Sequence, residues 1–591
     1  MDLQDIQQTS VWGLYEKGRN YHRLKGIYTD TDRNYRMYNG DQWEGAKLTG
    51  VEPVQKNFIR PIVRYKLGVI HDNLYAIVFS SQNNENREFQ KQAEKYCGML
   101  NRYASRIWEK DKMDKKTRQV TKDAAINDEG IIYVNFDEET KMPVNEVIDK
   151  NDIYYGNEND EDIQSQPYII IRKRMPVANA EELAIAYGVP VENLAYVRVG
   201  DNDTSEQSGE YAKEEVDDQV TILYKMYKKN GTVHFSIATR YVDILKDADI
   251  GIKLYPVAHF TWEEKKGSAR GEGEVRFLIP NQIEVNRTEM RRVLTVKDQA
   301  YPIRVADKSK ISNIDELDTV GATIYTQGQT VEDVRKILTT LQPAQMSPDV
   351  KQLQDDLIQV TRELAGAGEV ATGSVNPEDA SGRAILAVQQ ASQSPMTEQK
   401  EHFKAFLEDL ALIYLEYLIV YSVDGINMEE EVTDPKTNEK YMQVVNVPQT
   451  VLEQLQATVK VDITPKSVYD KFAQEQTIEN LLLSGLFTAQ RVSELRVYAE
   501  LLDDDSVAPK TKILEAVEKI EEEQRRIAMI QAQAQMMQQR AQQFLMEDPE
   551  AQASQMAEAM GGLEEQVDAS EEELEEVEEE MEVIEDNPDD N

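Results

Sequence analysis

The sequence lacks residues and runs that several classes of protein require. Its 591 residues include one cysteine, Cys97, which excludes an intrachain disulfide framework and a cysteine-based zinc cluster. Its longest apolar run, at 410–421, is far shorter than the ~20 residues that span a bilayer. The polar start MDLQDIQQTS does not resemble a secretory leader. We therefore expect no membrane span, and the single cysteine fits a reducing cytoplasm or any other compartment in which a protein needs no disulfide.

Motifs for the commonest catalytic chemistries are missing as well. There is no G-x-x-x-x-G-K-[ST] loop for nucleotide hydrolysis. The glycine-rich segments 271–274 and 366–369 do not follow a clear buried strand, which argues against a phosphate site. No two of the five histidines have metal-ligand spacing, and the acidic runs 157–162 and 503–505 are contiguous rather than spaced. We expect no cofactor, no bound metal and no enzymatic activity.

Negative charge is what the sequence has in excess. The net charge is −42, and sixteen acidic residues lie between Leu563 and Asn591, where there is no Lys or Arg. The rest of the chain is acidic too. Proteins that bind DNA tightly carry a basic stripe that neutralises phosphates. Contact with DNA should therefore be repulsive or sparse, unless the few basic clusters converge.

The first half of the chain mixes helices and strands. Residues 1–40 and 88–127 read as helical, and 57–80 as a helix followed by a strand. Residues 130–175 contain short strands, and Asn230-Gly231 between two strand-like runs predicts a hairpin. This order indicates an α+β fold rather than a βαβ alternation.

The second half is predicted to be mostly helical. One helix at 277–300 would be roughly 35 Å long at ~1.5 Å per residue. A second helix is expected at 347–365, and the residues between these helices form short extended pieces. The second helix carries one apolar stripe, formed by Val350, Leu353, Leu357, Val360 and Leu364.

Four segments, in this order, resemble the podovirus-type portal proteins of tailed bacteriophages. They are YNGDQW at 38–43, NFIRPIVRYKLGVIHDN at 57–73, GEGEVRFLIPNQIEVNRTEMRR at 271–292 and ASGRAILAVQQ at 380–390. Within the second segment, the family's Asn, Pro, Gly and Asn correspond to Asn57, Pro61, Gly68 and Asn73.

The resemblance implies a mostly helical α+β portal subunit with named regions. These regions are a wing (1–276), a first stem helix (277–300), a clip (301–346), a second stem helix (347–365), a channel loop (366–381), a long wing helix with strands (382–465), a crown (466–509), a helical barrel (510–545) and an acidic tail (546–591).

The resemblance also implies roles for individual residues. The channel loop would present Gly366, Gly368, Glu369, Thr372, Ser374 and Asn376. The cations that would face DNA or pair between subunits are Arg287, Arg291, Arg292 and Arg383. The clip would contact the terminase and the tail adaptor through Arg304, Lys308 and Lys310.

The implied function is that of a ring at one capsid vertex, with twelve subunits as in typical portals. Duplex DNA would pass through it during packaging and ejection, and an acidic channel with few cations would let that DNA slide. The expected partners are the terminase motor, the tail adaptor, the major capsid protein and a scaffolding protein, in a virion assembled in the host cytoplasm. Two alternatives remain at this point: another ring or tube protein of the virion, such as an adaptor, and an acidic metal-dependent nuclease.

Overall fold

The structure is a computed structural model. It describes residues 8–43, 52–80, 87–137, 139–197, 218–300, 303–317, 319, 321–327, 337–341, 346–367, 394–423, 425–433, 440–455, 458–465, 525, 526, 529, 532 and 536. The chain divides into two compact units, Met1–Thr464 and Pro465–Asn591. The helices and strands below belong to the first unit, apart from Pro465 at the end of the last strand. The predicted crown and nearly all of the predicted barrel and tail lie outside the described residues.

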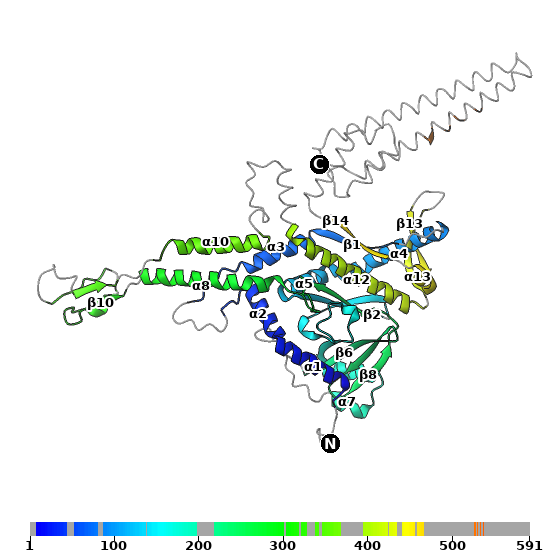
Figure 1. The fold of residues 1–591 in the computed structure, drawn as a ribbon, viewed down its shortest axis with the longest axis horizontal. Helices are drawn as coiled ribbons and strands as arrows, with labels where there is room; N and C mark the ends of the chain where they lie inside the picture. Colours follow the sequence, from blue (N-terminus) through cyan, green and yellow to red (C-terminus); the bar gives the residue numbers. More distant parts are fainter. Residues whose placement is uncertain are drawn as a thin grey trace, which may run out of the picture. The chain divides into compact units, whose positions relative to one another are not determined.

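Helices and strands are mixed along the chain without a regular βαβ alternation, as in an α+β protein (Figure 1). The helices are α1 (Ser10–Lys25), α2 (Ile27–Asn39), α3 (Ile59–His71), α4 (Arg87–Lys110), α5 (Met113–Asn127), α6 (Val177–Ala186), α7 (Val191–Val197), α8 (Glu274–Ala300), α10 (Asp349–Leu364), α12 (Thr397–Tyr421) and α13 (Gln449–Leu455). The strands are β1 (Asn73–Ser80), β2 (Glu129–Asp137), β3 (Met142–Ile148), β4 (Ile153–Tyr155), β5 (Ile169–Pro176), β6 (Gln219–Lys229), β7 (Thr232–Ala238), β8 (Asp243–Asp249), β9 (Val257–Thr261), β10 (Arg304–Ala306), β11 (Leu338–Thr340), β12 (Ile426–Thr433), β13 (Lys440–Val447) and β14 (Thr458–Pro465).

The N-terminal helical segment is two helices rather than the one predicted. Gly26 has a φ of 71°, a left-handed conformation that ends α1 and begins α2. Its backbone N–H donates to the carbonyls of His22 and Arg23, as at a helix C-terminus. At the other end, the Thr9 side chain caps α1 by accepting from the Trp12 N–H. The sequence contains this glycine, but the spacing of apolar residues alone does not show that one helix ends there and another begins.

The largest sheet has the strand order β4-β5-β6-β7-β8 and is antiparallel throughout. The hairpin predicted at Asn230-Gly231 joins β6 to β7, and these residues have φ values of 56° and 90°. Positive φ at both positions is what a two-residue hairpin turn needs. Apolar residues of α1 pack with one set of sheet residues, and those of α6 and α7 with another. The α+β prediction is confirmed.

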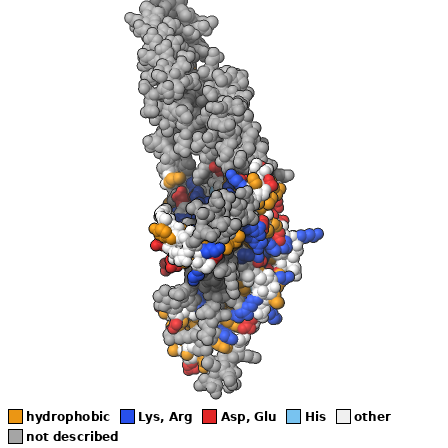
Figure 2. Space-filling view, turned by 90° about the vertical axis from the view of Figure 1, so that its left-hand side faces the viewer, with side chains coloured by type: hydrophobic (Ala, Val, Ile, Leu, Met, Phe, Trp, Pro, Cys, Tyr) orange, Lys and Arg blue, Asp and Glu red, His pale blue; other side chains and the backbone are white. Residues whose placement is uncertain are grey.

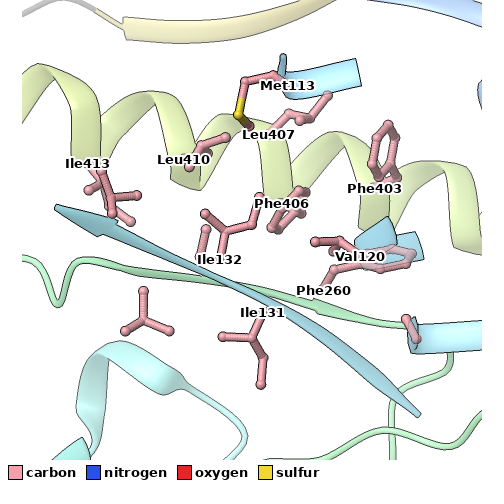
Figure 3. Packing of buried hydrophobic residues seen from close by; sticks show 14 of the residues in the cluster. Met113, Val120, Ile131, Ile132, Phe260, Phe403, Phe406, Leu407, Leu410 and Ile413 are labelled. Atoms are coloured by element: carbon pink, nitrogen blue, oxygen red, sulfur yellow. The ribbon is translucent and has the colours of Figure 1, made fainter. Parts of the chain in front are cut away.

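A second sheet, β3-β2-β9, lies in the main core. Helix α12 packs on β9 and α5 packs on β2. Figure 3 shows Phe406 and Leu410 of α12 above the sheet, with Ile132 pointing toward them and Ile131 pointing away. Because side chains alternate along a strand, β2 buries apolar residues on both of its faces. Apolar side chains of helices α8 and α10 also pack against this core.

Candidate functional site

Helices α8 and α10 form an antiparallel pair (Figure 1). Asn281 donates to the Thr361 hydroxyl at 2.9 Å, and further along α8 Arg292 donates to Gln354 at 2.8 Å. Residue numbers therefore rise on one helix as they fall on the other. The predicted helix 277–300 begins three residues earlier, at Glu274. The seam between the two helices is thus held partly by buried polar side chains.

The segment between α8 and α10 is a β-containing excursion. Strands β10 and β11 pair antiparallel, with Val305 opposite Thr339. Ile311 and Thr326, which lie between β10 and β11 in the sequence, pair in an isolated antiparallel bridge. The short extended pieces predicted here therefore pair with each other. A helix, a β excursion and a returning helix form one continuous insertion.

Three residues of the apolar stripe of α10 are exposed, whereas Leu357 of the same stripe packs against the main core. Leu353, Val360 and Leu364 are 64%, 48% and 82% exposed in the single chain. The residues that α10 buries are instead Gln354 and Thr361. The exposed part of the stripe, formed by Leu353, Val360 and Leu364, gives α10 an apolar face suited to a further partner.

The predicted cations of α8 are paired within the same helix. Arg287 and Arg291 each lie 3.6 Å from Glu284, and both are well exposed. Arg292 lies 2.9 Å from Glu289. Exposed pairs contribute little to stability, so Arg287 and Arg291 stay available to other anions. Arg292, by contrast, is held in the seam by Glu289 and Gln354. Arg383 lies outside the described residues.

The three predicted clip residues lie in the β excursion but do not gather in one site. Arg304, in β10, donates to the Leu317 carbonyl. Lys310 lies 3.7 Å from Asp307, and Lys308 is exposed. The structure places all three on the surface of this segment.

Of the predicted channel loop, the structure describes Gly366 and Ala367. Gly366 has a φ of 69° and follows the end of α10. A Cβ built on Gly366 would lie 3.1 Å from Pro395, just before α12. The chain therefore leaves α10 and enters α12 at neighbouring points. Gly368, Glu369, Thr372, Ser374 and Asn376 lie outside the described residues.

Three of the segments that carried the family resemblance meet in space. The Asn57 side chain donates to the Tyr38 carbonyl at 3.0 Å and accepts from the Arg60 N–H at 3.2 Å. Gln282 of α8 accepts from the Phe58 N–H at 3.0 Å. These contacts connect YNGDQW, the start of α3 and the root of α8. The motif residues therefore hold α8 on the rest of the fold.

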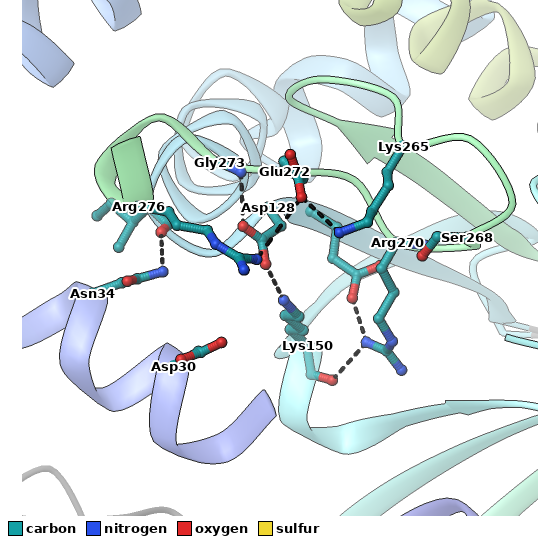
Figure 4. Close-up of polar contacts among 12 residues, drawn as sticks. Asp30, Asn34, Asp128, Lys150, Lys265, Ser268, Arg270, Glu272, Gly273 and Arg276 are labelled. Carbon is teal, nitrogen blue, oxygen red and sulfur yellow. Dashed lines mark hydrogen bonds and ion pairs between the residues drawn. The ribbon is translucent and has the colours of Figure 1, made fainter. Parts of the chain in front are cut away.

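An ion cluster that sequence reasoning did not find lies just before α8, around Arg270, which Figure 4 shows near Lys150. We call it the Arg270 cluster: Arg270, Glu129, Glu158, His22 and His259. The Arg270 side chain is 6% exposed and pairs with Glu129, which is fully buried. It also donates to Glu158 at 2.8 Å and to His22 at 2.9 Å. His259 completes the cluster, 2.7 Å from Glu129.

The Arg270 cluster connects segments that are distant in the sequence. His22 belongs to α1, Glu129 begins β2, and His259 lies in β9. Arg270 stands four residues before α8. The cluster therefore links the N-terminal helix and the three-stranded sheet to the start of the helix pair.

The glycines of GEGE, at 271–274, serve packing at this root. A Cβ on Gly271 would lie 2.5 Å from the Glu263 carbonyl oxygen, and one on Gly273 would lie 2.8 Å from the Asp128 nitrogen. The Gly273 N–H donates to Asp128, which also pairs with Lys150 (Figure 4). Glycine is needed here because the backbone segments approach so closely. Close packing of the backbone therefore accounts for both glycines without a phosphate ligand.

Charge and burial set the protonation of the cluster. Burial lowers the pKa of His22 to about 4, and the neighbouring Arg270 guanidinium adds to this effect. Burial alone would raise the pKa of Glu129 and Glu158, but Arg270 and the adjacent histidines more than offset it and lower each to about 2. His22 is therefore neutral and both carboxylates are charged near pH 7. The neutral His22 accepts from Arg270 through Nε2.

These shifts predict that acid weakens the fold. Below His22's ordinary pKa of 6.5, the unfolded chain binds a proton that the folded chain does not. We expect a loss of about 2–3 kcal/mol between pH 6.5 and 4.5 from this group, with a further loss below pH 4.5 from the carboxylates. Thermal unfolding from pH 8 to 4 measures it. The variant His22→Gln keeps an acceptor for Arg270 and should flatten the upper part of this dependence; an unchanged profile would contradict the assignment.

The comparisons with known proteins agree with these observations. The chain matches the family described as "Phage P22-like portal protein" over residues 19–566. No curated protein matches it. The class is therefore that of bacteriophage head-to-tail connectors, which are structural virion proteins of DNA packaging rather than enzymes. Since the match covers most of its length, the chain belongs to the P22-like portal protein family.

Family membership brings general properties. Portal proteins form oligomeric rings at a capsid vertex and work with capsid protein, terminase and DNA. None of the described helices is both long and apolar enough to cross a membrane. Within the described residues, no group of three or more His, Cys, Asp or Glu side chains is placed to hold a metal ion.

Proposed function

We propose that this chain is the subunit of a twelve-membered ring through which duplex DNA enters and leaves the capsid. The observation that supports this beyond the family match is the insertion formed by α8, the β10–β11 excursion and α10. Another virion ring protein, such as an adaptor, is expected to lack this insertion of a helix, a β excursion and a returning helix. A nuclease is disfavoured because the family is structural.

With this insertion as the reference, we assign the regions of a portal subunit to the chain. Helices α8 and α10 are the stem, and the excursion between them is the clip, which docks the terminase and later the tail adaptor. Arg304, Lys308 and Lys310 lie on the clip surface and are proposed to contact these partners. The α+β body is the wing, which meets the capsid. Residues 466–509, 510–545 and 546–591 are proposed as crown, barrel and tail.

The exposed stripe on α10 supports packing of the stem between subunits. Leu353, Val360 and Leu364 would be covered by a neighbouring stem. Burying one leucine side chain contributes roughly 1.5–3 kcal/mol. Repeated around a ring, this contact would give the stem the apolar interface that a single chain lacks.

The channel loop is proposed to be residues 366–381, which lie between α10 and α12 in the sequence. Gly366, after α10, lies next to Pro395, just before α12. Leaving α10 and α12 intact while removing part of this segment is therefore feasible. Arg287 and Arg291 are proposed to line the stem portion of the same channel, where their weak pairs with Glu284 can exchange with phosphates.

Deleting residues 369–379, which spares the buried Ala367, tests the conduit role. Rings should remain visible by electron microscopy, while DNA packaging or retention in capsids assembled with the variant should fall at least tenfold. The control replaces the same residues by a Gly/Ser segment of equal length. Intact rings with normal packaging would remove the loop assignment, and an absence of rings from the unaltered protein would overturn the proposed function itself.

A further inference from the structure

Helices α3 and α5 concentrate positive charge in a strongly acidic protein. Helix α3, IRPIVRYKLGVIH, contains no Asp or Glu. Helix α5, MDKKTRQVTKDAAIN, contains two acids and four bases. Figure 2 shows more generally that Lys and Arg side chains gather on one side of the described surface in that view.

Five of these cations form a basic strip, defined as Arg60, Arg64, Lys115, Arg118 and Lys122. Arg60 and Arg64 are one turn apart on α3, on its exposed side. Lys115, Arg118 and Lys122 follow one another along one side of α5, where Lys115 and Arg118 are exposed and Lys122 is half-buried. The other two bases, Lys66 and Lys116, are excluded because they pair with Glu274 and Asp111.

Contacts place the two halves of the strip next to each other. Helices α3 and α5 pack together. Arg60 lies 5.9 Å and Lys122 lies 5.5 Å from the centre of the Tyr38 ring. A cation near an aromatic ring is held in place without losing its charge. Tyr38 thus joins the α3 cations to the α5 cations.

The acids of α5 do not neutralise the strip. Asp123 accepts from the Tyr35 hydroxyl at 2.5 Å, and Asp114 accepts from the Trp108 indole at 2.9 Å. Among the described residues, no carboxylate forms an ion pair with Arg60, Arg64, Lys115 or Arg118. The Lys122 charge does act on neighbouring Asp123, whose pKa burial raises and Lys122 lowers. At least four positive charges are therefore available to a ligand.

The chain's overall charge does not prevent binding here. At physiological salt, exposed charges more than about 8–10 Å apart are largely screened. The local cations therefore decide what approaches this surface. From Lys115 to Lys122 the protein helix rises about 10 Å, and one DNA strand presents roughly three phosphates over that length of its helix axis, at about 3.4 Å of axis each.

We propose that the basic strip is a contact surface for the phosphate backbone of duplex DNA. This inference rests on the proposed function, since it takes DNA as the ring's cargo. The contact is electrostatic and independent of sequence, because phosphates carry no base information. The basic strip is a second DNA-binding surface, separate from the proposed stem cations, on a protein that is acidic as a whole.

The test variant is Arg64→Gln/Lys115→Gln/Arg118→Gln in the full chain. It leaves Arg60 and Lys122 beside Tyr38, so the packing around that ring is kept. The control is Lys246→Gln/Lys253→Gln/Lys266→Gln, which removes the same charge at three exposed lysines elsewhere. The probe is a blunt duplex of random sequence, and binding is measured by fluorescence anisotropy over a salt series.

We expect the test variant to bind the duplex at least tenfold more weakly than the unaltered protein at low salt. Each phosphate interaction that the substitutions remove should also reduce the slope of log affinity against log salt by about 1. The control should bind within twofold of the unaltered protein. Equal binding by the test and control variants would overturn the proposal.

Two further measurements separate the remaining outcomes. Polyglutamate that displaces the duplex at equal charge concentration would show an acidic-protein site instead of a DNA site, which also overturns the proposal. Electron microscopy of the same samples reports the ring. Rings with unaltered DNA binding in the test variant would reject the strip while leaving the portal function standing, whereas an absence of rings from the unaltered protein would reject that function.

Discussion

Replacing Arg270 by methionine is expected to lower the free energy of unfolding of the first unit by about 3–5 kcal/mol. Glu129 is fully buried and the Glu158 side chain is 10% exposed, and Arg270 is the cation that pairs with each of them. Methionine fills a similar volume but leaves two negative charges without their main partner. The cost is that of buried, uncompensated charge rather than of a cavity.

Denaturant unfolding measures the loss of stability of the whole unit, and hydrogen exchange measures the loss at the start of α8. The unfolding midpoint should fall, and amides at the start of α8 should exchange faster, because the Arg270 cluster anchors its root. Arg276→Met is the matched control, since Arg276 is 47% exposed and lies 3.9 Å from Glu272. Its effect should be below about 1 kcal/mol.

A compensating variant makes the electrostatic cause testable. Adding Glu129→Gln and Glu158→Gln to Arg270→Met removes the unpaired charges, so it should recover part of the lost stability. If the triple variant is less stable than Arg270→Met alone, the carboxylates are not the source of the loss. If Arg270→Met equals the Arg276→Met control, the cluster does not anchor the helix pair.

Introducing two carboxylates on the exposed face of α10, by Leu353→Glu and Val360→Glu, should prevent ring formation. Both side chains are about half or more exposed in the single chain, so the isolated subunit should fold normally. In a ring each would be buried against a neighbouring stem, at a loss of roughly 1.5–3 kcal/mol per side chain plus the cost of burying a charge. At least a hundredfold weaker association is expected.

Analytical ultracentrifugation and electron microscopy report the result directly. The control, Lys351→Gln with Gln352→Glu, changes the charge of the same helix by the same amount at exposed positions off the stripe. It should assemble like the unaltered protein. Rings of the stripe variant at the concentrations where the unaltered protein assembles would show that this face of α10 is not an interface.

Local patterns predicted local structure well. The Asn230-Gly231 dipeptide marked the hairpin because only a few residues tolerate positive φ at both positions of such a turn. The helices at 277–300 and 347–365 appear as α8 and α10, and the extended pieces between them appear as β10 and β11. Each of these features depends on neighbouring residues, which is why one sequence was enough.

The Arg270 cluster could not be found in this way. Its members come from α1, β2, the segment after β4, β9 and the loop before α8. A charged residue in a sequence is most often on the surface, so none of these positions signals burial by itself. The nearest signal was GEGE, whose glycines indicate close backbone approach, but not what approaches.

The amino-acid sequence alone determined the class of fold, the excess of negative charge, the order of the family landmarks and the positions of the helix pair. Only the tertiary structure decided which side chains each helix buries. Periodicity shows that Leu353 and Val360 share a stripe, yet whether that stripe meets the same chain or another depends on contacts between distant segments. The same reason places Arg270 in the core and leaves Arg64 and Arg118 exposed, since burial of a charge depends on partners brought together by folding.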